Sequence, residues 1–302
     1  MTVYTKYSSK ILLFGEHTVN RGSNALAIPY PTFGGEWAYS LDFSQQQNLS
    51  AFATYLENLQ QEGILQAELD LTAFRAELAK GLYFNANIPM GYGLGSSGAL
   101  CAAVYDRFCK NKMERTESER YAELRSALAQ LECFFHGASS ATDVLVAYLN
   151  QPLIIRGNGL VETVTLPKNP TLTFFLLDTE TVRSAGTWVK YFLQRCEKAD
   201  FKTDVVTKLV WYNNEVIANF LNAQWDTFFE NITDISHLQI NQLAEMTPPA
   251  FHQIWQESLK EKNYRLKLCG AGGGGFILGI TFDWQQTQLE LSTYKLLKVN
   301  TN

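Results

Sequence analysis

A segment rich in glycine and serine, PMGYGLGSSG at residues 89–98, is the first part of the chain whose composition indicates chemistry. Glycines let the backbone adopt positive φ angles and approach a ligand closely. Where such a loop leads into a helix, the amides of the helix N-terminus favour an anion, most often phosphate. The serine hydroxyls can add donors or ligate Mg²⁺. We therefore predict a phosphate-binding loop for a nucleotide, made by Gly91, Gly93, Leu94, Gly95, Ser96, Ser97 and Gly98.

Two other interpretations of this loop stay open. Gly93, Gly95 and Gly98 formally satisfy the dinucleotide pattern G-x-G-x-x-G. However, the preceding LYFNANI is polar for a buried parallel strand, and no strand with a terminal acid follows at the needed distance. The loop could also be a structural turn with a serine N-cap. The pattern G-x-x-x-x-G-K-[ST] does not occur, which excludes an ordinary P-loop NTPase.

A second glycine-rich segment, KLCGAGGGG at residues 267–275, lies between two apolar runs. Five glycines lose much conformational entropy on folding, and a hairpin would need only two. Successive amides in a tight glycine loop can form an anion-binding nest. The run therefore predicts a loop that faces substrate or phosphate, with a flexible turn as the alternative.

The N-terminal segment SKILLFGEH places Lys10 at the start of an apolar strand and Glu16 and His17 just past its end. By themselves these residues have ordinary explanations. Lys10 could be a solvated strand end, and His17 a loop histidine with satisfied hydrogen bonds.

The surrounding elements follow from apolar spacing and from glycine and proline breaks. We expect strands at 10–14, 25–29, 39–43, 82–88, 172–177, 265–269 and 276–281. We expect helices within 49–81 and at 99–110, 114–135, 141–149, 184–197, 203–222, 224–230, 234–245 and 251–262. The prolines of PKNPT at 167–171 suggest a boundary between domains 1–167 and 168–302.

The composition is that of a globular protein, with 302 residues, 46% hydrophobic residues and a net charge of −5. The acidic balance argues against a general nucleic-acid binder. No apolar run approaches the length of a membrane span, and no signal-peptide pattern opens the chain. The five cysteines form no C-x-x-C pair and suit reduced thiols, so we expect a cytoplasmic protein.

Taken together and in order, three segments resemble the GHMP kinases. The first motif, K-[IV]-[IL]-L-x-G-E-H-x-V-x-x-G, is matched by residues 10–22. The second, P-x-G-x-G-L-G-S-S, is matched by 89–97. The third, K-[LM]-x-G-A-G-G-G-G, is matched by 267–275. Val19 and Asn20 stand where galactokinases carry D-Y, so the chain is more similar to the mevalonate kinases of this family.

The resemblance extends to the segment LECFFHGASSATD at 131–143, which is similar to G-E-x-x-x-H-G-x-x-S-G-x-D. It implies that Asp143 orients or deprotonates the attacking hydroxyl, with Lys10 nearby to stabilise developing negative charge. It implies that Ser97 and Glu132 hold Mg²⁺ against the phosphates of ATP. Leu131, Ala141 and Thr142 depart from the family pattern but remove no catalytic group.

The remaining implications concern substrate and fold. The resemblance implies transfer of a phosphoryl group from ATP to the primary hydroxyl of a small molecule, first of all mevalonate, in isoprenoid biosynthesis. Phosphomevalonate, a sugar, homoserine or a catalytically silent binding protein stay as alternatives. The acceptor site is expected to include Glu16, His17, Arg183, Gly272 and Gly273. The implied fold is α+β, with an N-terminal half like ribosomal protein S5 domain 2, a ferredoxin-like C-terminal half and the active site between them. A homodimer stays open, and neither nucleic acid nor a membrane is expected as a partner.

Overall fold

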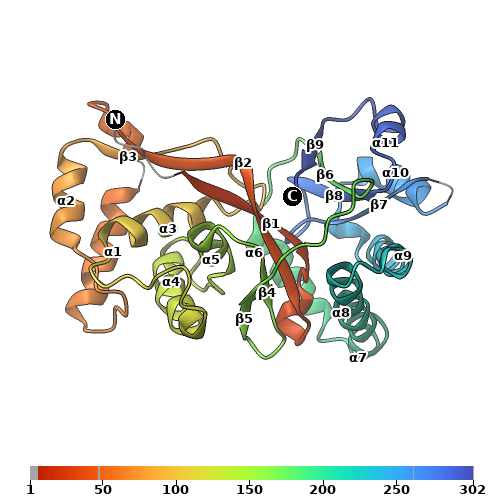
Figure 1. The fold of residues 1–302 in the computed structure, drawn as a ribbon, viewed down its shortest axis with the longest axis horizontal. Helices are drawn as coiled ribbons and strands as arrows, with labels where there is room; N and C mark the ends of the chain where they lie inside the picture. The colour runs from red at the N-terminus through yellow and green to blue at the C-terminus, as the bar shows by residue number, and fades with distance from the viewer. Residues whose placement is uncertain (1–5, 47, 261, 302) are drawn as a thin grey trace. The chain divides into compact units, whose positions relative to one another are not determined.

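The computed structural model describes residues 6–46, 48–260 and 262–301, and these residues form an α+β fold (Figure 1). The chain divides into two compact units that interleave along the sequence. Unit 1 contains Met1–Lys10, Pro29–Pro89 and Leu94–Gln151, and unit 2 contains Ile11–Ile28, Met90–Gly93 and Pro152–Asn302. The chain passes between the two units several times. The division into two domains that are contiguous in sequence, 1–167 and 168–302, stays a prediction.

Two long strands run through both units, and they carry the residues of the first motif. They are β1 (Tyr7–Phe14) and β2 (Ala25–Tyr39), which pair with each other. We predicted two short strands at 25–29 and 39–43, and this was wrong because β2 continues past Pro29. The strand can include prolines because its registered pairings with β3 (Leu82–Ala86) and β4 (Leu153–Ile155) lie on either side of them, at Gly35–Tyr39 and Ala25–Ala27.

Unit 1 is mainly helical and packs α3 against both α4 and α5. Its elements after β2 are α1 (Leu49–Gln61), α2 (Leu71–Ala79), β3 (Leu82–Ala86), α3 (Ser96–Phe108), α4 (Tyr121–His136) and α5 (Thr142–Leu149). The Asp70 side chain caps α2 by accepting a hydrogen bond from the Ala73 amide at 2.9 Å. Each helix confirms an expected one within a few residues, except that α4 begins only at Tyr121.

Unit 2 contains an antiparallel sheet in the order β7-β8-β6-β9, with helices packed on it. Its elements are β4 (Leu153–Ile155), β5 (Val161–Thr163), β6 (Thr173–Asp178), α6 (Ala185–Arg195), α7 (Ala199–Phe201), α8 (Thr207–Leu221), α9 (Trp225–Gln242), α10 (His252–Ser258), β7 (Tyr264–Leu268), β8 (Phe276–Thr281), α11 (Trp284–Glu290) and β9 (Leu296–Val299). The central strands β6 and β8 are buried along their whole length, as their continuous apolar runs indicate.

The core of unit 2 includes four phenylalanines that contact one another edge to face or tilted. Phe14, Phe174, Phe220 and Phe228 come from β1, β6, α8 and α9, and their ring centroids lie 5.5–6.3 Å apart. The cluster fixes the end of β1 just before Glu16. Helices α8 and α9 pack side by side (Figure 1).

Several elements of unit 2 differ from the sequence prediction. Residues 225–242 form one long helix, α9, and not two helices at 224–230 and 234–245, because no glycine or proline interrupts it. The helix expected at 251–262 forms as α10 and ends at Ser258, and the later elements α11 and β9 were not predicted. The hairpin of β4 and β5 was missed because each strand has only three residues. Within the described residues no helix is both long and apolar enough to cross a lipid bilayer.

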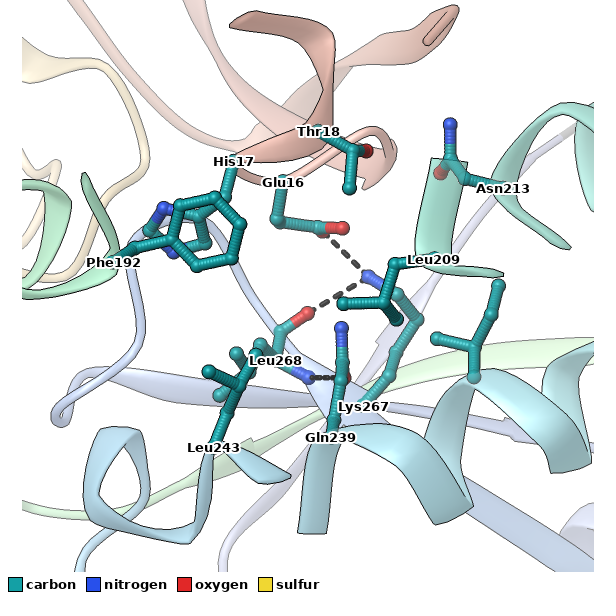
Figure 2. Close-up of a pocket in the computed structure, with 11 residues that line it drawn as sticks. Glu16, His17, Thr18, Phe192, Leu209, Asn213, Gln239, Leu243, Lys267 and Leu268 are labelled. Atoms are coloured by element: carbon teal, nitrogen blue, oxygen red, sulfur yellow. Dashed lines mark hydrogen bonds and ion pairs between the residues drawn. The ribbon is translucent and has the colours of Figure 1, made fainter. Parts of the chain in front are cut away.

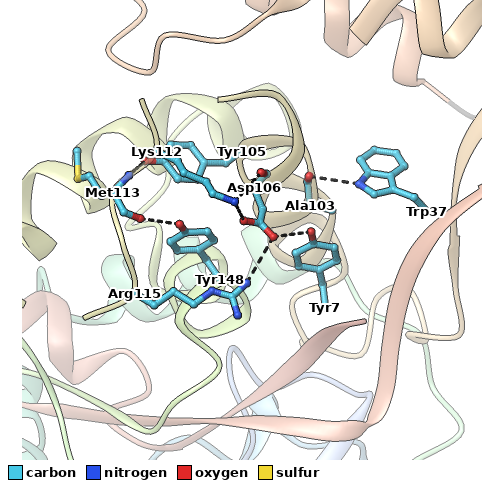
Figure 3. Close-up of polar contacts among 9 residues, drawn as sticks. All are labelled: Tyr7, Trp37, Ala103, Tyr105, Asp106, Lys112, Met113, Arg115 and Tyr148. Carbon is cyan, nitrogen blue, oxygen red and sulfur yellow. Dashed lines mark hydrogen bonds and ion pairs between the residues drawn. The ribbon is translucent and has the colours of Figure 1, made fainter. Parts of the chain in front are cut away.

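A polar network in unit 1 ties the start of β1 to the last turns of α3 (Figure 3). The Tyr7 hydroxyl donates to Asp106 Oδ2 at 2.9 Å, and Lys112 and Arg115 pair with the same carboxylate at 2.7 and 3.5 Å. Burial and the neighbouring Asp106 raise the pKa of Tyr7, so its hydroxyl stays a donor. The network anchors β1, which carries Lys10, to α3, which carries Ser97.

Replacing Tyr7 by phenylalanine tests this anchor. We expect Tyr7→Phe to lower the free energy of unfolding by about 1–2 kcal/mol, because a buried hydrogen bond to a charged acceptor is lost. Urea titration followed by circular dichroism measures the change. Tyr39→Phe is the matched control, because the Tyr39 side chain is 43% exposed and its loss should change stability less. Equal effects of the two variants would contradict the anchoring role.

Candidate active site

The predicted catalytic pair is formed in unit 1. Lys10 Nζ lies 3.0 Å from Asp143 Oδ1, with side-chain exposures of 8% and 31%. Lys10 points from β1, and its amide donates to the Leu94 carbonyl at 3.0 Å. Asp143 lies in the first turn of α5, where Ala141 and not Asp143 is the N-cap residue. A half-exposed carboxylate beside a buried ammonium can receive a proton from a substrate hydroxyl and keep its orientation.

Two glycines of the loop allow the start of α3 to approach this pair. Gly95 is the N-cap of α3 with φ +75°, and a Cβ there would lie 3.1 Å from Lys10 Cγ. A Cβ on Gly98 would lie 2.8 Å from both the carbonyl carbon and the Cβ of Asp143. Because those atoms belong to the start of a helix, they cannot move aside easily. The glycines at these positions are therefore required by packing as well as by any ligand.

The N-terminus of α3 presents backbone amides beside the Lys10–Asp143 pair. The first hydrogen bond within the helix runs from the Ala99 amide to the Gly95 carbonyl at 2.9 Å, so the amides of residues 96–98 precede it. Such amides and the helix dipole favour an anion. This geometry matches the predicted phosphate-binding role of Leu94, Gly95, Ser96, Ser97 and Gly98, which stays a prediction. Gly91 and Gly93 of the same loop belong to unit 2.

The second predicted carboxylate, Glu132, is buried in unit 1 with only 4% of its surface exposed. Its Oε1 lies 3.5 Å from the Ser97 hydroxyl, and its Oε2 accepts a hydrogen bond from Ser139. Burial raises the pKa of Glu132 to about 7, helped by the charge of Asp143 and opposed by the hydrogen bond from Ser139 and the charge of Lys10. A cation near this carboxylate would stabilise its ionised form.

The oxygens of Ser97 and Glu132 fit a Mg²⁺ ion that takes its other ligands from a nucleotide and from water. Magnesium prefers oxygen ligands and is often held by one or two carboxylates together with substrate phosphates. In the part of the chain that the structure describes, no cluster of three or more His, Cys, Asp or Glu side chains could hold a metal ion alone. The binding of Mg²⁺ by Ser97 and Glu132 stays a prediction.

Two residues of this region were not among the predicted site residues. His136 Nε2 lies 2.9 Å from Ser97 Oγ. Ser139 donates to Glu132 and accepts from the Ala141 amide at 2.8 Å, so it connects Glu132 to the N-cap of the helix that carries Asp143. The sequence shows only two consecutive serines after a glycine there, which resembles an ordinary helix break.

The predicted acceptor residues lie in unit 2. His17 Nε2 contacts the Ala271 carbonyl at 3.2 Å, and its ring stacks on Phe192 with centroids 4.7 Å apart. Burial lowers the pKa of His17 to about 4, with further lowering by the positive charges of Arg183 and Lys267. The imidazole is therefore neutral at pH 7. Glu16 is paired with Lys267 at 2.5 Å (Figure 2).

Arg183 is buried, with 8% of its surface exposed, so the common case of a solvated arginine does not apply. Its Nη2 donates to the Cys269 carbonyl at 3.3 Å. A Cβ on Gly93 would lie 2.1 Å from that Nη2, and one on Gly270 would lie 2.9 Å from it. The guanidinium therefore lies against both glycine-rich segments of unit 2, 90–93 and 270–275.

The glycine run at 270–275 is not a plain hairpin turn. Each of its five glycines has a positive φ, from +65° to +142°. Gly272 approaches the Met246 carbonyl, and a Cβ on Gly273 would lie 1.6 Å from Trp188 Nε1. The Gly273 amide also donates to the Met246 carbonyl at 2.6 Å. Close packing thus requires the glycines, and the substrate-binding role of Gly272 and Gly273 stays a prediction.

Comparison with known proteins supports the resemblance found in the sequence. Residues 50–151 match the family model described as the GHMP kinases N terminal domain. Over 95% of its length it is 23% identical to a mevalonate kinase of Dictyostelium discoideum, of which it covers 89%. A mevalonate kinase of Arabidopsis thaliana is also 23% identical, with 98% of this chain and 96% of the relative covered.

Solved structures of GHMP kinases share the fold of this chain. Streptococcus pneumoniae phosphomevalonate kinase, in complex with phosphomevalonate and AMPPNP, has a TM-score of 0.65 at 15% identity, covering 99% of this chain and 100% of that one. Mevalonate kinase of L. major, in complex with R-mevalonate, has 0.65 at 14% identity, covering 99% and 96%. Lactococcus lactis galactokinase, complexed with galactose, has 0.64 at 17%, covering 98% and 92%. The expected GHMP kinase fold is thereby confirmed.

Replacing Glu132 by glutamine tests its raised pKa. Glu132 has a folded-state pKa of about 7, above its usual 4.5, so the folded state binds more protons between these values. Its burial therefore costs stability increasingly as pH rises from about 4.5 to 7. We expect the stability of Glu132→Gln relative to wild type, without metal, to increase by roughly 2–3 kcal/mol from pH 5 to pH 8.

Urea unfolding in EDTA at several pH values measures this difference. Glu123→Gln is the control, because Arg120 lowers the pKa of that surface carboxylate, which is ionised across this range. A pH-independent difference between wild type and Glu132→Gln would show that Glu132 ionises at its ordinary pKa.

Proposed function

We propose that this protein is an ATP-dependent kinase that phosphorylates the primary hydroxyl of a small molecule, converting mevalonate to 5-phosphomevalonate. The observation that carries the proposal is the Lys10–Asp143 pair, 3.0 Å apart beside the N-terminus of α3. Phosphoryl transfer needs a group that orients the attacking hydroxyl and positive groups that stabilise the transferred phosphoryl. Unit 1 brings a carboxylate, an ammonium and a helix N-terminus together.

In this mechanism Asp143 accepts the proton of the acceptor hydroxyl while Lys10 holds the carboxylate and stabilises negative charge on the transferring group. The amides at the start of α3 bind phosphate oxygens. Ser97 and Glu132 would hold Mg²⁺, which supplies positive charge against the β- and γ-phosphates. Ser139 holds the Glu132 carboxylate through a hydrogen bond.

For the acceptor we propose a site made by residues of unit 2, with His17 and Arg183 as its chief polar groups. A guanidinium can bind a carboxylate through two parallel hydrogen bonds, and mevalonate carries one carboxylate. The mevalonate kinases among the relatives support this choice over a sugar. So do Val19 and Asn20, which replace the residues with which galactokinases grip sugar hydroxyls. The reaction belongs to isoprenoid biosynthesis, and five cysteines in the thiol form suit a cytoplasmic enzyme.

A coupled ADP-release assay with Mg·ATP tests the acceptor. The panel contains mevalonate, phosphomevalonate, homoserine and galactose, each with and without enzyme. We expect turnover on mevalonate, with kcat/KM at least about a hundredfold above that on the others, because a polar site rejects acceptors that leave its groups unpaired. Turnover on another acceptor would keep the chemistry and reject mevalonate. Binding of ATP without turnover on any acceptor would favour a silent ligand-binding protein.

Replacing Asp143 by asparagine tests the catalytic role directly. We expect Asp143→Asn to lower kcat by about 10²–10⁴-fold on the best acceptor, because the amide cannot take a proton. The KM for ATP should change little, whereas the melting temperature should fall, because the buried Lys10 ammonium loses its charged partner. Asp106→Asn, which removes a carboxylate at the other end of α3, is the control and should retain turnover. Near-normal kcat in Asp143→Asn would reject the assignment.

A further inference from the structure

A buried ion pair in unit 2 joins two motifs that are distant in sequence. Lys267 Nζ lies 2.5 Å from Glu16 Oε1, and the two side chains are only 1% and 3% exposed (Figure 2). Glu16 follows the end of β1, and Lys267 lies on β7. The ammonium also lies over the Phe14 ring, 5.8 Å from its centroid. Each of these buried charges is stabilised by the other, because a buried charge without a partner strongly destabilises the folded protein.

Each partner continues directly into a segment that we assign to the acceptor site. Lys267 Nζ donates a second hydrogen bond to the Leu268 carbonyl at 2.8 Å, at the point where β7 leads into the glycine run. The Leu268 amide in turn donates to Gln239 Oε1 at 2.8 Å. On the other side, Glu16 is followed by His17, which has a φ of +60° and contacts the Ala271 carbonyl. The ion pair therefore holds both sides of the contact between His17 and the glycine run.

The space beside the pair is too small for an acceptor. The cavity lined by Glu16, His17, Phe192, Gln239 and Lys267 has a volume of about 10 Å³. That is room for about one water molecule. A substrate hydroxyl that reached Glu16 would have to displace the Lys267 ammonium from a buried site. Direct contact between Glu16 and an acceptor is therefore disfavoured, although we first expected it from the sequence.

We propose that Glu16 and Lys267 are positioning residues, which hold His17 and the glycine run at 270–275 in the arrangement that binds the acceptor. Neither side chain touches the acceptor itself. This inference rests on the proposed function for the assignment of His17 to the acceptor site. It adds Lys267 as a residue on which acceptor binding depends.

Kinetics of three variants test the proposal: Lys267→Met, Glu16→Gln and the double variant that combines them. We expect each to raise the KM for the acceptor about tenfold or more, because small displacements of binding groups have large effects, while the KM for ATP stays within about twofold. Lys262→Met is the matched control. It removes a lysine of the same unit that pairs with Glu290 at 3.6 Å near the surface, and both KM values should stay unchanged.

The double variant keeps the test valid if a single variant fails to fold. It leaves no unpaired charge in the protein interior, so it should fold even if Lys267→Met does not. It still lacks the hydrogen bond from residue 267 to the Leu268 carbonyl, so its acceptor KM should stay raised. A normal acceptor KM in the folded double variant would overturn the proposal. So would a raised KM in Glu16→Gln alone with a normal one in Lys267→Met, because Glu16 would then act on the acceptor directly.

Histidine NMR gives a readout that does not need turnover. The chain has four histidines, so their ring protons can be assigned by substitution. In wild type, His17 should not titrate between pH 5 and 8. In the double variant the ring should lose its fixed contact with the Ala271 carbonyl and become more exposed. Its pKa should then rise towards the ordinary 6.5, and the loss of the Lys267 charge raises it further. Unchanged His17 resonances would overturn the positioning role. Loss of the contact in a protein that phosphorylates no acceptor would instead reject the proposed function.

Discussion

The close approach of α3 to the Lys10–Asp143 pair is the constraint on which the rest of unit 1 depends. Lys10 is almost fully buried, so its ammonium needs the Asp143 carboxylate at 3.0 Å. That distance is reached only because the start of α5 lies against Gly98, where any side chain would meet backbone atoms at 2.8 Å. The Lys10–Asp143 ion pair therefore depends on the glycine at position 98 and on the packing of α5 against the start of α3. The anchoring of β1 by Tyr7 at the far end of α3 fits the same requirement.

The two carboxylates of unit 1 lie in different environments, and this difference suits two roles. Asp143 is partly exposed and contacts an ammonium, whereas Glu132 is buried among hydroxyls and has a pKa raised to about 7. Carboxylates in contrasting environments can divide acid–base and ligand duties within one site. A buried carboxylate whose pKa is raised to near neutral pH gains most from a bound cation, because the cation offsets the cost of ionising the carboxylate.

Local sequence patterns predicted much of the fold and the residues that meet in unit 1, and they failed where contacts between residues distant in sequence determine the structure. The apolar runs of β6 and β8 and the loop before α3 could be placed from their composition. The length of β2 could not, because its continuation past Pro29 depends on pairing with β3, which is about fifty residues away in the register of Trp37 with Phe84. The role of Ser139 was also hidden, since a serine after a glycine indicates a helix break and gives no sign of its contact with Glu132. Asp143 was predicted because its spacing from Glu132 resembles that of a known family, and the structure places it beside Lys10.

Glu16 and Lys267 illustrate how burial and pairing bear on the role that is proposed for a motif residue. Both belong to segments that resemble GHMP kinase motifs, and one of them was expected to bind the acceptor. In the structure their charges meet at 2.5 Å, and hardly any of either side chain is exposed. The glycines of the third motif give the same lesson, because Gly273 is required by its approach to Trp188 before any ligand is considered. A residue can therefore belong to a functional motif because it holds another residue in place. The exposed fraction and the partner of its side chain, which only the structure gives, distinguish this role from direct contact with substrate.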